Sequence, residues 1–272
     1  MDKNLREVLA FPIVQDDCFQ WNVDELFRLL VAAHTVSAKQ GIIKNCGTVH
    51  VCLSGGLDSS TSIGLMVCGG IRPEQIFAHT ISISHHHADA VFAKKVAHHF
   101  GVACELIVPS TSDVDSMREH LYSSLGRVTL GEVGTHLLYA ELAKANVKSV
   151  IAHDGIDELL GGYWDHRSSQ TPRFTFEHFW ARLNQDHLVP LQHASEMHGV
   201  EIEFPYLQKD VVEYITRIPF TNRTSRHESK IPLRQIARLV GVPVEVIMRQ
   251  KIGFCDALVI NERTDTRNSS ET

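Results

Sequence analysis

The amino-acid sequence predicts an α/β fold, in which a parallel β-sheet with flanking helices is followed by a smaller helical region. Two observations predict it. Strand-like and helix-like segments alternate through the first 150 residues, and after about residue 170 helices and loops follow without clear strands. Strands that alternate with helices are typical of βαβ units and a parallel sheet. We therefore expect an α/β domain at 1–170, a helical part at 171–260 and a disordered polar tail at 261–272.

The expected strands are short apolar runs bounded by small or turn-forming residues. They cover residues 48–54, 76–83, 104–108 and 149–152. Ligands of parallel α/β sheets bind beyond the carboxyl ends of the strands. The residues that follow the first, second and fourth of these strands are therefore the candidates for a functional site.

The expected helices have apolar residues on one face. Before residue 150 they cover 23–40, 57–68, 88–100, 113–125 and 133–145, and after it 174–185, 209–218, 231–240 and 244–248. Gly101 ends the helix at 88–100, because glycine readily takes the left-handed conformation found at helix ends.

The composition indicates a globular protein, which we expect in the cytoplasm. Hydrophobic residues make up 43% and charged residues 21% of the 272 residues. No apolar run approaches the ~20 residues that a membrane-spanning helix needs. The polar segment 1–7 has no signal-peptide core. A membrane is therefore not an expected partner.

The net charge and the cysteine spacing argue against two further classes of protein. The formal net charge of −6 lacks the basic excess of most nucleic-acid-binding domains, so nucleic acid is not an expected partner. The six cysteines form no Cys-x-x-Cys pair, so we expect free thiols. This pattern also counts against enzymes that transfer sulfur through paired cysteines.

The strongest local signal is a small-residue loop between the first strand and the helix at 57–68. It reads Ser54-Gly55-Gly56-Leu57-Asp58-Ser59-Ser60. Glycines let the backbone approach an anion, the first helix amides lack internal partners, and the serines add donors. Asp58 would repel a phosphate unless a cation lay between them, which indicates a Mg²⁺ ligand. The alternative is a glycine turn with an acid in the first helical turn.

This loop resembles the Ser-Gly-Gly-x-Asp-Ser pyrophosphatase loop (PP-loop) of ATP enzymes that cleave between the α and β phosphates. The resemblance implies the adenine nucleotide alpha hydrolase-like fold for the sheet domain. It also implies an ATP site formed by the backbone and side chains at Leu53, Ser54, Gly55, Gly56, Asp58, Ser59, Ser60, Ile83 and Gly155.

A second loop narrows the family. Residues 154–163 read Asp-Gly-Ile-Asp-Glu-Leu-Leu-Gly-Gly-Tyr and follow the fourth strand. They resemble the acidic signature of asparagine synthetase and β-lactam synthetase. The resemblance implies that Asp157 and Asp58 hold Mg²⁺, and that Asp154 lies near the reacting carboxylate. Glu158 and Tyr163 become candidate substrate contacts, and an acidic helix start is the structural alternative.

Three downstream segments also resemble that family, in its order. They are 199–207, which contains Glu201 and Glu203, then Lys230-Ile231-Pro232-Leu233-Arg234, and 243–254, which contains Lys251. The resemblance implies the leading catalytic role for Lys251 and a supporting one for Lys230. Lysines directed at a pentacoordinate phosphorus stabilise its developing negative charge.

The sequence departs from the family pattern at several positions. Glu203 stands where arginine is usual, Gln208 replaces an aspartate, and Ala152-His153 replaces Ser-Gly. An acid near the pocket would repel a second carboxylate on the substrate, which puts aspartate in doubt. We expect the 53 residues before the phosphate loop to be too few for the glutaminase domain of the glutamine-dependent enzymes. We therefore expect free ammonia, another amine, or ammonia from a separate glutaminase subunit.

Two histidine sites remain open. His153 directly precedes Asp154, so substrate contact or proton transfer is a candidate role for it. His85-His86-His87 follows the second strand, and either a metal site or a polar turn would account for it.

These features predict an ATP-dependent ligase. ATP and Mg²⁺ would serve to adenylate a carboxylate with release of pyrophosphate, and ammonia or an amine would then form an amide. The rivals are another PP-loop enzyme that modifies a nucleotide or tRNA, and an ATP-binding regulator without turnover. The sequence does not identify the substrates or fix the oligomeric state.

Overall fold

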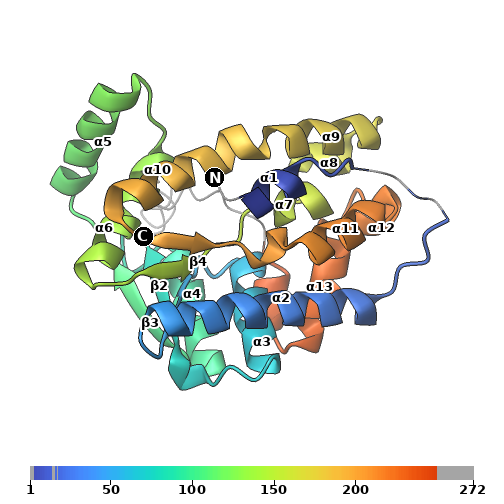
Figure 1. The fold of residues 1–272 in the computed structure, drawn as a ribbon, viewed down its shortest axis with the longest axis horizontal. Coiled ribbons are helices and arrows are strands. Elements are labelled where there is room, and N and C mark those ends of the chain that lie inside the picture. Colours follow the sequence, from blue (N-terminus) through green and yellow to red (C-terminus); the bar gives the residue numbers. More distant parts are fainter. Residues whose placement is uncertain (1–2, 14–15, 17, 250–272) are drawn as a thin grey trace, which may run out of the picture.

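A five-stranded sheet lies at the centre of the molecule. The computed structural model describes residues 3–13, 16 and 18–249. All neighbouring strands are parallel, in the order β3-β2-β1-β4-β5. The strands are β1 (Val49–Cys52), β2 (Ile76–Ile81), β3 (Ala103–Ile107), β4 (Ser149–Ile151) and β5 (Glu201–Glu203). The predicted parallel α/β sheet with flanking helices is confirmed (Figure 1).

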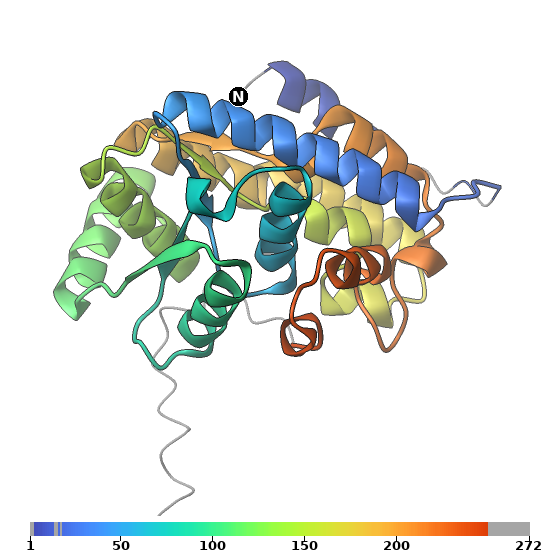
Figure 2. The ribbon, with the colours of Figure 1, turned by 90° about the horizontal axis from the view of Figure 1, so that it is seen from below.

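Helices cover both faces of this sheet (Figures 1 and 2). In the first half they are α1 (Lys3–Leu9), α2 (Val23–Lys44), α3 (Leu57–Cys68), α4 (Ala88–Phe100), α5 (Thr111–Leu125), α6 (Leu130–Lys144), α7 (Ile156–Leu160) and α8 (Trp164–Ser168). In the second half they are α9 (Pro172–Leu183), α10 (Val189–His198), α11 (Lys209–Arg217), α12 (Phe220–Arg223), α13 (Ile231–Leu239) and α14 (Val244–Ile247). Shorter turns are η1 (Pro73–Gln75), a π-helical segment η2 (Asn184–Leu188) and η3 (Pro205–Leu207).

The alternation of side chains along the strands produces two cores. Val49 and Val51 of β1 point to the face covered by α2, α3 and α4, and belong to the larger hydrophobic cluster. Cys52 points to the opposite face and packs against the smaller cluster, which α6 and α10 dominate. Burial on both faces explains why the strands read as apolar runs in the sequence.

Local sequence signals set several helix ends. The side chain of Asn22 accepts a hydrogen bond from the Glu25 amide at 2.7 Å at the start of α2. Capping boxes begin α5 and α6, through Ser110 with Asp113 and through Thr129 with Glu132. Gly101 ends α4 in the left-handed conformation, as predicted.

The expectation of no strand after residue 170 was wrong. β5 pairs with β4 at the sheet edge, where Glu203 lies opposite Ile151. It has three residues, and two of them are glutamates. Such a short, polar edge strand lacks the apolar run that marks the interior strands.

The strand order reverses at β1, whose neighbours β2 and β4 continue in opposite directions. A crevice opens at such a switch point, beyond the carboxyl ends of the strands. The phosphate loop follows β1 and the acidic loop follows β4, so the topology brings the two loops together. None of the described helices is long and apolar enough to cross a membrane.

Candidate active site

The phosphate loop is held in a conformation that requires glycine at position 55. Gly55 has a φ of +67°, and a Cβ there would lie 2.4 Å from the Ala93 amide nitrogen. No side chain larger than hydrogen fits between the loop and α4. Close packing therefore fixes the backbone at this position.

The amino end of α3 lies beyond the carboxyl end of β1. Its N-cap is Gly56, and no side chain caps the helix. The Ser54 hydroxyl accepts a hydrogen bond from the Gly56 amide at 3.3 Å and lies 3.3 Å from the Ser59 hydroxyl. The loop thus presents amides and hydroxyls at the positive end of a helix, an arrangement that suits an anion.

The acidic loop begins a short helix, α7, directly after β4. Gly155 is its N-cap in the left-handed conformation, and Asp157 and Glu158 lie in its first turn. Leu207 of η3 packs against Gly155, because a Cβ on that glycine would lie 2.3 Å from Leu207 Cδ2. The segment 199–207 therefore packs against the acidic loop.

Lys230 joins the two loops. Its Nζ donates hydrogen bonds to both oxygens of Asp58 at 2.7 Å and forms an ion pair with Asp157 Oδ1 at 2.7 Å. The Lys230 side chain is 4% exposed. Two carboxylates from different strand ends therefore converge on one buried cation.

The surroundings of Lys230 keep it charged. Burial alone would lower the pKa of Lys230, but the carboxylates of Asp157 and Asp58 outweigh it and raise this pKa. Gly162 makes the close approach feasible. A Cβ at that position would lie 1.6 Å from Asp157 Oδ1 and 2.5 Å from Lys230 Cε.

Two arginines brace this end of the site. Arg234 donates to the Ser229 carbonyl at 2.7 Å and to the Ile247 carbonyl, so it fixes the turn that carries Lys230. Lys230 itself precedes α13 with a φ of +52°. Lys230 lies outside this helix, because α13 begins at Ile231 with proline in its first turn.

Arg249 reaches the phosphate loop from the end of the described chain. It pairs with Asp89 of α4 and donates to the Gly55 carbonyl at 3.2 Å. Its guanidinium also lies 4.6 Å from the centroid of the Phe92 ring. Arg249 lies in the segment 243–254 that resembles the family, but no motif gives this residue a role.

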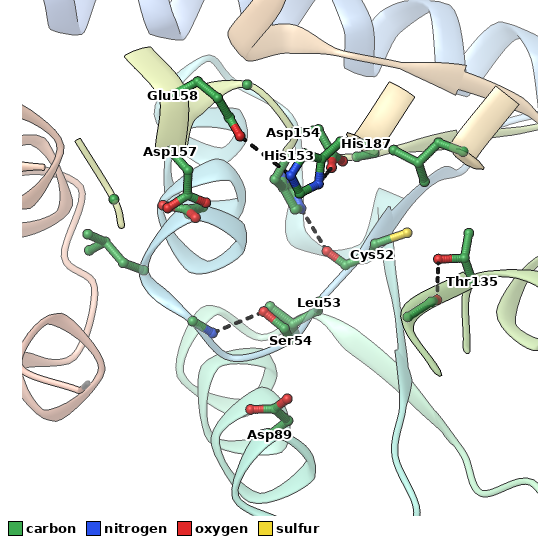
Figure 3. A pocket seen from close by; sticks show the side chains of 18 of the residues that line it. Cys52, Leu53, Ser54, Asp89, Thr135, His153, Asp154, Asp157, Glu158 and His187 are labelled. Carbon is green, nitrogen blue, oxygen red and sulfur yellow. Dashed lines mark hydrogen bonds and ion pairs between the residues drawn. The ribbon is translucent and has the colours of Figure 1, made fainter. Parts of the chain in front are cut away.

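A second polar cluster lies at the other end of the site. The Tyr163 hydroxyl donates to Glu158 Oε1 at 2.6 Å and lies 3.3 Å from His187 Nε2. His187 Nε2 is 3.7 Å from Glu158 Oε1, and its Nδ1 is 3.9 Å from Asp154 Oδ1. Figure 3 shows Asp154, Glu158 and His187 on the opposite side of Ser54 from Asp89.

Burial raises the pKa values of two groups in this cluster. Burial raises the pKa of Glu158, and the neighbouring Asp157 carboxylate adds to the rise. Burial followed by the charge of Glu158 also raises the pKa of Tyr163, which remains a hydrogen-bond donor at neutral pH.

His153 lies between the strands rather than in open solvent. Its Nε2 is 2.7 Å from the Cys52 carbonyl, so this nitrogen carries the proton and donates it. Burial lowers the pKa of His153 to about 4. The neutral, hydrogen-bonded ring lines the cavity, but these surroundings disfavour the proton transfer considered for it from the sequence.

One cavity of about 590 Å³ contains both ends of the site. Among the sequence-predicted residues, its walls include Leu53, Ser54, Gly56, Asp58, His153, Asp154, Gly155, Asp157, Glu158, Tyr163 and Lys230. Gly55, Ser59 and Ser60 are buried and do not line the cavity. Ile83 lies two residues beyond the end of β2 and does not line this cavity.

Glu201 and Glu203 are not brought to the cavity. Both belong to the edge strand β5, and Lys44 of α2 pairs with Glu201 Oε2 at 2.7 Å and with Glu203 Oε1 at 2.8 Å. The unusual acid at position 203 thus has a local cation as its partner. Glu203 does not line the cavity, so it is not placed to repel a second carboxylate on a substrate bound there.

Lys251, the expected leading catalytic residue, lies outside the described residues, as does the expected tail at 261–272. The alternative metal site at the histidine run also finds no support within 3–13, 16 and 18–249. No group of three or more His, Cys, Asp or Glu residues there could hold a metal ion. His87 instead caps α4 by accepting from the Asp89 amide at 3.2 Å. The described cysteines are free, as predicted.

A family model of asparagine synthase matches residues 43–192 and 167–268. The chain belongs to the asparagine synthase family. A relative from Methanocaldococcus jannaschii, named "Putative asparagine synthetase (glutamine-hydrolyzing) 1", is 24% identical over 196 residues. That match covers 67% of this chain and 35% of the relative, so the chain spans about a third of the length of the relative.

Solved structures with low overall similarity include three synthetases. The glutamine-dependent NAD+ synthetase of Acinetobacter baumannii, in complex with ADP, is 15% identical over 86% of this chain and 37% of that chain, with a TM-score of 0.46. The NMN synthetase of Francisella tularensis is 15% identical over 72% of this chain and 94% of that one, with a TM-score of 0.36. The NH3-dependent NAD synthetase of Campylobacter jejuni is 14% identical over 73% and 98%, with a TM-score of 0.37.

Proposed function

We propose that this chain is an ATP-dependent, amide-forming synthetase. It adenylates a substrate carboxylate, releases pyrophosphate, and transfers the acyl group to ammonia or another amine. The observation that carries the proposal is the convergence of Asp58 and Asp157 on the buried cation of Lys230, beside an open helix amino end. Membership in the asparagine synthase family supports the same class of reaction.

The phosphate end of the cavity is assigned to ATP. The amides and hydroxyls of loop 54–60 bind the phosphates, and Arg249 holds the loop in place through the carbonyls of Ser54 and Gly55. Leu53 and Gly155, at the ends of the two central strands, border the nucleotide. The α/β part at 1–170 thus supplies the phosphate loop, while Lys230 comes from the helical part at 171–260.

Magnesium fits the donors present. Asp58 and Asp157 bring their carboxylate oxygens close together, because both contact the Lys230 ammonium at 2.7 Å. Mg²⁺ is typically held in proteins by one or two carboxylates together with substrate phosphates. When bound there, it would supply charge that favours the departure of pyrophosphate.

The first step needs stabilisation of negative charge at the α-phosphorus. An oxygen of the substrate carboxylate attacks this phosphorus, and the bond to pyrophosphate breaks. Lys230 carries the positive charge that stabilises the oxygens of the transition state. Lys251 is assigned the leading role by resemblance to the family.

The second step uses the polar end of the cavity. The amine nitrogen attacks the acyl carbon, and AMP leaves. Asp154, Glu158 and Tyr163 line this end of the cavity, and we assign them to the acyl group and the incoming amine. Free ammonia, another amine, or a separate glutaminase subunit would supply the nitrogen.

The test is pyrophosphate release from ATP and Mg²⁺ with a panel of carboxylates. The panel contains acetate, glycine, β-alanine, aspartate, glutamate and succinate, each with and without ammonium chloride. We expect AMP and pyrophosphate as products with at least one carboxylate, and loss of release in Lys251→Ala. Production of ADP and phosphate would overturn the proposal. ATP binding without pyrophosphate release would favour a regulator.

A further inference from the structure

His187 is a cavity residue to which the sequence motifs give no role. It lies in the π-helical segment η2, between α9 and α10, and its ring lines the cavity. Neither the phosphate loop nor the acidic loop contains it. Single π-helical turns occur often at functional sites, because they redirect a side chain out of the regular helix pattern.

The position of the ring suits proton exchange. Its Nε2 lies 3.3 Å from the Tyr163 hydroxyl and its Nδ1 lies 3.9 Å from Asp154 Oδ1. The His187 side chain is 43% exposed, whereas Glu158 beside it is 3% exposed. His187 therefore reaches both the buried acids of the site and the solvent.

The other cavity histidine at this end is in a different state. His153 donates its Nε2 proton to the Cys52 carbonyl, and its half-buried ring is neutral. A ring in that state resists accepting a second proton. Of the two histidines, His187 has the geometry for taking a proton from a bound molecule.

We propose that His187 is the base that accepts the proton lost by the attacking amine in the amide-forming step. The proposal rests on the proposed function and assigns a catalytic residue to its second half. It predicts that the first half, in which pyrophosphate is released, does not depend on His187.

The step balances without any further reactant. The nitrogen lone pair of ammonia or a primary amine forms the new bond to the acyl carbon. The bond between this carbon and the AMP oxygen breaks, and AMP leaves with the electron pair. One proton passes from the nitrogen to the imidazole of His187, and from there to solvent. The products are the amide, AMP and a released proton.

Three elements bring polar groups to the ring of His187. Asp154 comes from the β4–α7 loop and Glu158 from α7, and the Tyr163 hydroxyl approaches from the start of α8. Asp186 precedes His187 on η2, and Arg182 of α9 pairs with it at 2.7 Å. Asp186 is therefore paired with Arg182, so the imidazolium formed after proton transfer faces the Asp154 carboxylate, whose Oδ1 lies 3.9 Å from Nδ1.

The experiment separates the two halves of the reaction. ATP–pyrophosphate exchange reports adenylation, and mass spectrometry of the amide, formed with ammonium chloride, reports the second half. Both are measured for the parent, His187→Gln, His187→Ala and the control His178→Gln. His178 is an exposed histidine of α9 outside the cavity wall. The carboxylate is the panel member with the fastest exchange.

We expect exchange in His187→Gln close to that of the parent, and amide formation reduced at least about 100-fold, the usual contribution of a general base. Added imidazole should restore part of the amide formation in His187→Ala, which a merely structural role would not allow. The control should match the parent in both assays.

Three results would overturn the assignment. They are unchanged amide formation in His187→Gln, an equal loss of exchange and amide formation, and no rescue of His187→Ala by imidazole. If the parent itself shows no exchange with any panel carboxylate, the proposed function fails, and the assignment fails with it. Exchange in the parent thus distinguishes the two failures.

Discussion

The two ends of the cavity are built in different ways. At the phosphate end, Lys230 contacts Asp58 and Asp157 at 2.7 Å, and Arg249 pairs with Asp89. At the other end, the ring nitrogens of His187 lie 3.3–3.9 Å from their polar neighbours. The first end is closely paired and buried, whereas the second includes a side chain open to solvent.

This difference matches the chemistry proposed for each end. Charge stabilisation at phosphorus benefits from groups that are fixed before the reaction, because reorganising them would cost free energy. Proton transfer to solvent benefits from a group that contacts both the site and water. The comparison predicts that substitutions at the phosphate end abolish both half-reactions, whereas those at the other end act on the second.

The largest effect is expected for Lys230→Met. It removes the cation between two carboxylates, and loss of one preorganised charge-stabilising group typically costs about 10²–10³-fold in rate. We expect ATP–pyrophosphate exchange to fall by that factor. The matched control is Arg238→Met, which removes an exposed cation of α13 with one partner at 3.9 Å. Exchange within a few-fold of the parent in Lys230→Met would contradict the account.

Gly162→Ala should disturb the same end through packing alone. The added Cβ would overlap Asp157 Oδ1 and Lys230 Cε, so the pair must separate. Overpacking costs about 1–3 kcal/mol, which urea denaturation would measure, and exchange should fall as well.

Gly241→Ala is the control for Gly162→Ala. It adds a Cβ at a φ of +78° with no heavy atom within 4 Å, so it strains the backbone without touching the site. A loss of exchange in this control, or none in Gly162→Ala, would show that packing around Lys230 does not matter.

The free energy of unfolding should fall in mild acid, because the folded protein keeps histidines near the site neutral. Burial lowers the pKa of His34 to about 3 and that of His153 to about 4, from an ordinary value of 6.5. Both rings contact Tyr206, whose hydroxyl donates to the Asp58 carbonyl. Above pH 6.5 both rings are neutral in the folded and the unfolded chain, so their contribution to the free energy of unfolding is fully present. Below it the unfolded chain binds protons that the folded chain does not.

The free energy of unfolding should therefore decrease between pH 6.5 and 4, by about 1.4 kcal/mol per pH unit for each ring. Urea denaturation at half-unit intervals measures the slope. His34→Gln should reduce the slope, because it removes one of the rings that contribute to it. An unchanged slope in this variant would contradict the assignment.

The smallest effect is expected for Glu203→Gln. Glu203 pairs with Lys44 at the sheet edge, away from both ends of the cavity. Partly exposed ion pairs contribute about 1 kcal/mol or less, so a small loss of stability is expected, with no change in which carboxylate is used. Glu201→Gln, on the same strand and 69% exposed, is the matched control. A changed carboxylate preference in Glu203→Gln would restore this residue to the substrate site.

Much of the fold could be predicted because its signals are local. The interior strands are apolar runs, and the helices beside them end at residues such as Gly101. β5 was missed because its pairing with β4 stabilises a segment with two glutamates that has no strand signal of its own. The helix predicted at 231–240 also has a local signal, since Pro232 lies in its first turn.

The site could be predicted where short motifs carry it. Asp58, Asp154 and Asp157 follow strands whose order the fold class implies, and the structure places them around one cavity. His187 and Asp89 have no such motif, because only tertiary packing of η2 and α4 brings them there. Glu203 shows the converse, because its departure from the motif suggested a role in the site, whereas the structure pairs it with Lys44.

The most direct test of the central claim follows an isotope. With the panel carboxylate that supports pyrophosphate release labelled with ¹⁸O in its carboxyl group, adenylation transfers one labelled oxygen to the phosphorus. The account predicts AMP that carries one ¹⁸O, in proportion to the amide formed. Label in inorganic phosphate, or unlabelled AMP beside labelled amide, would show that the carboxylate is not adenylated and would contradict the account.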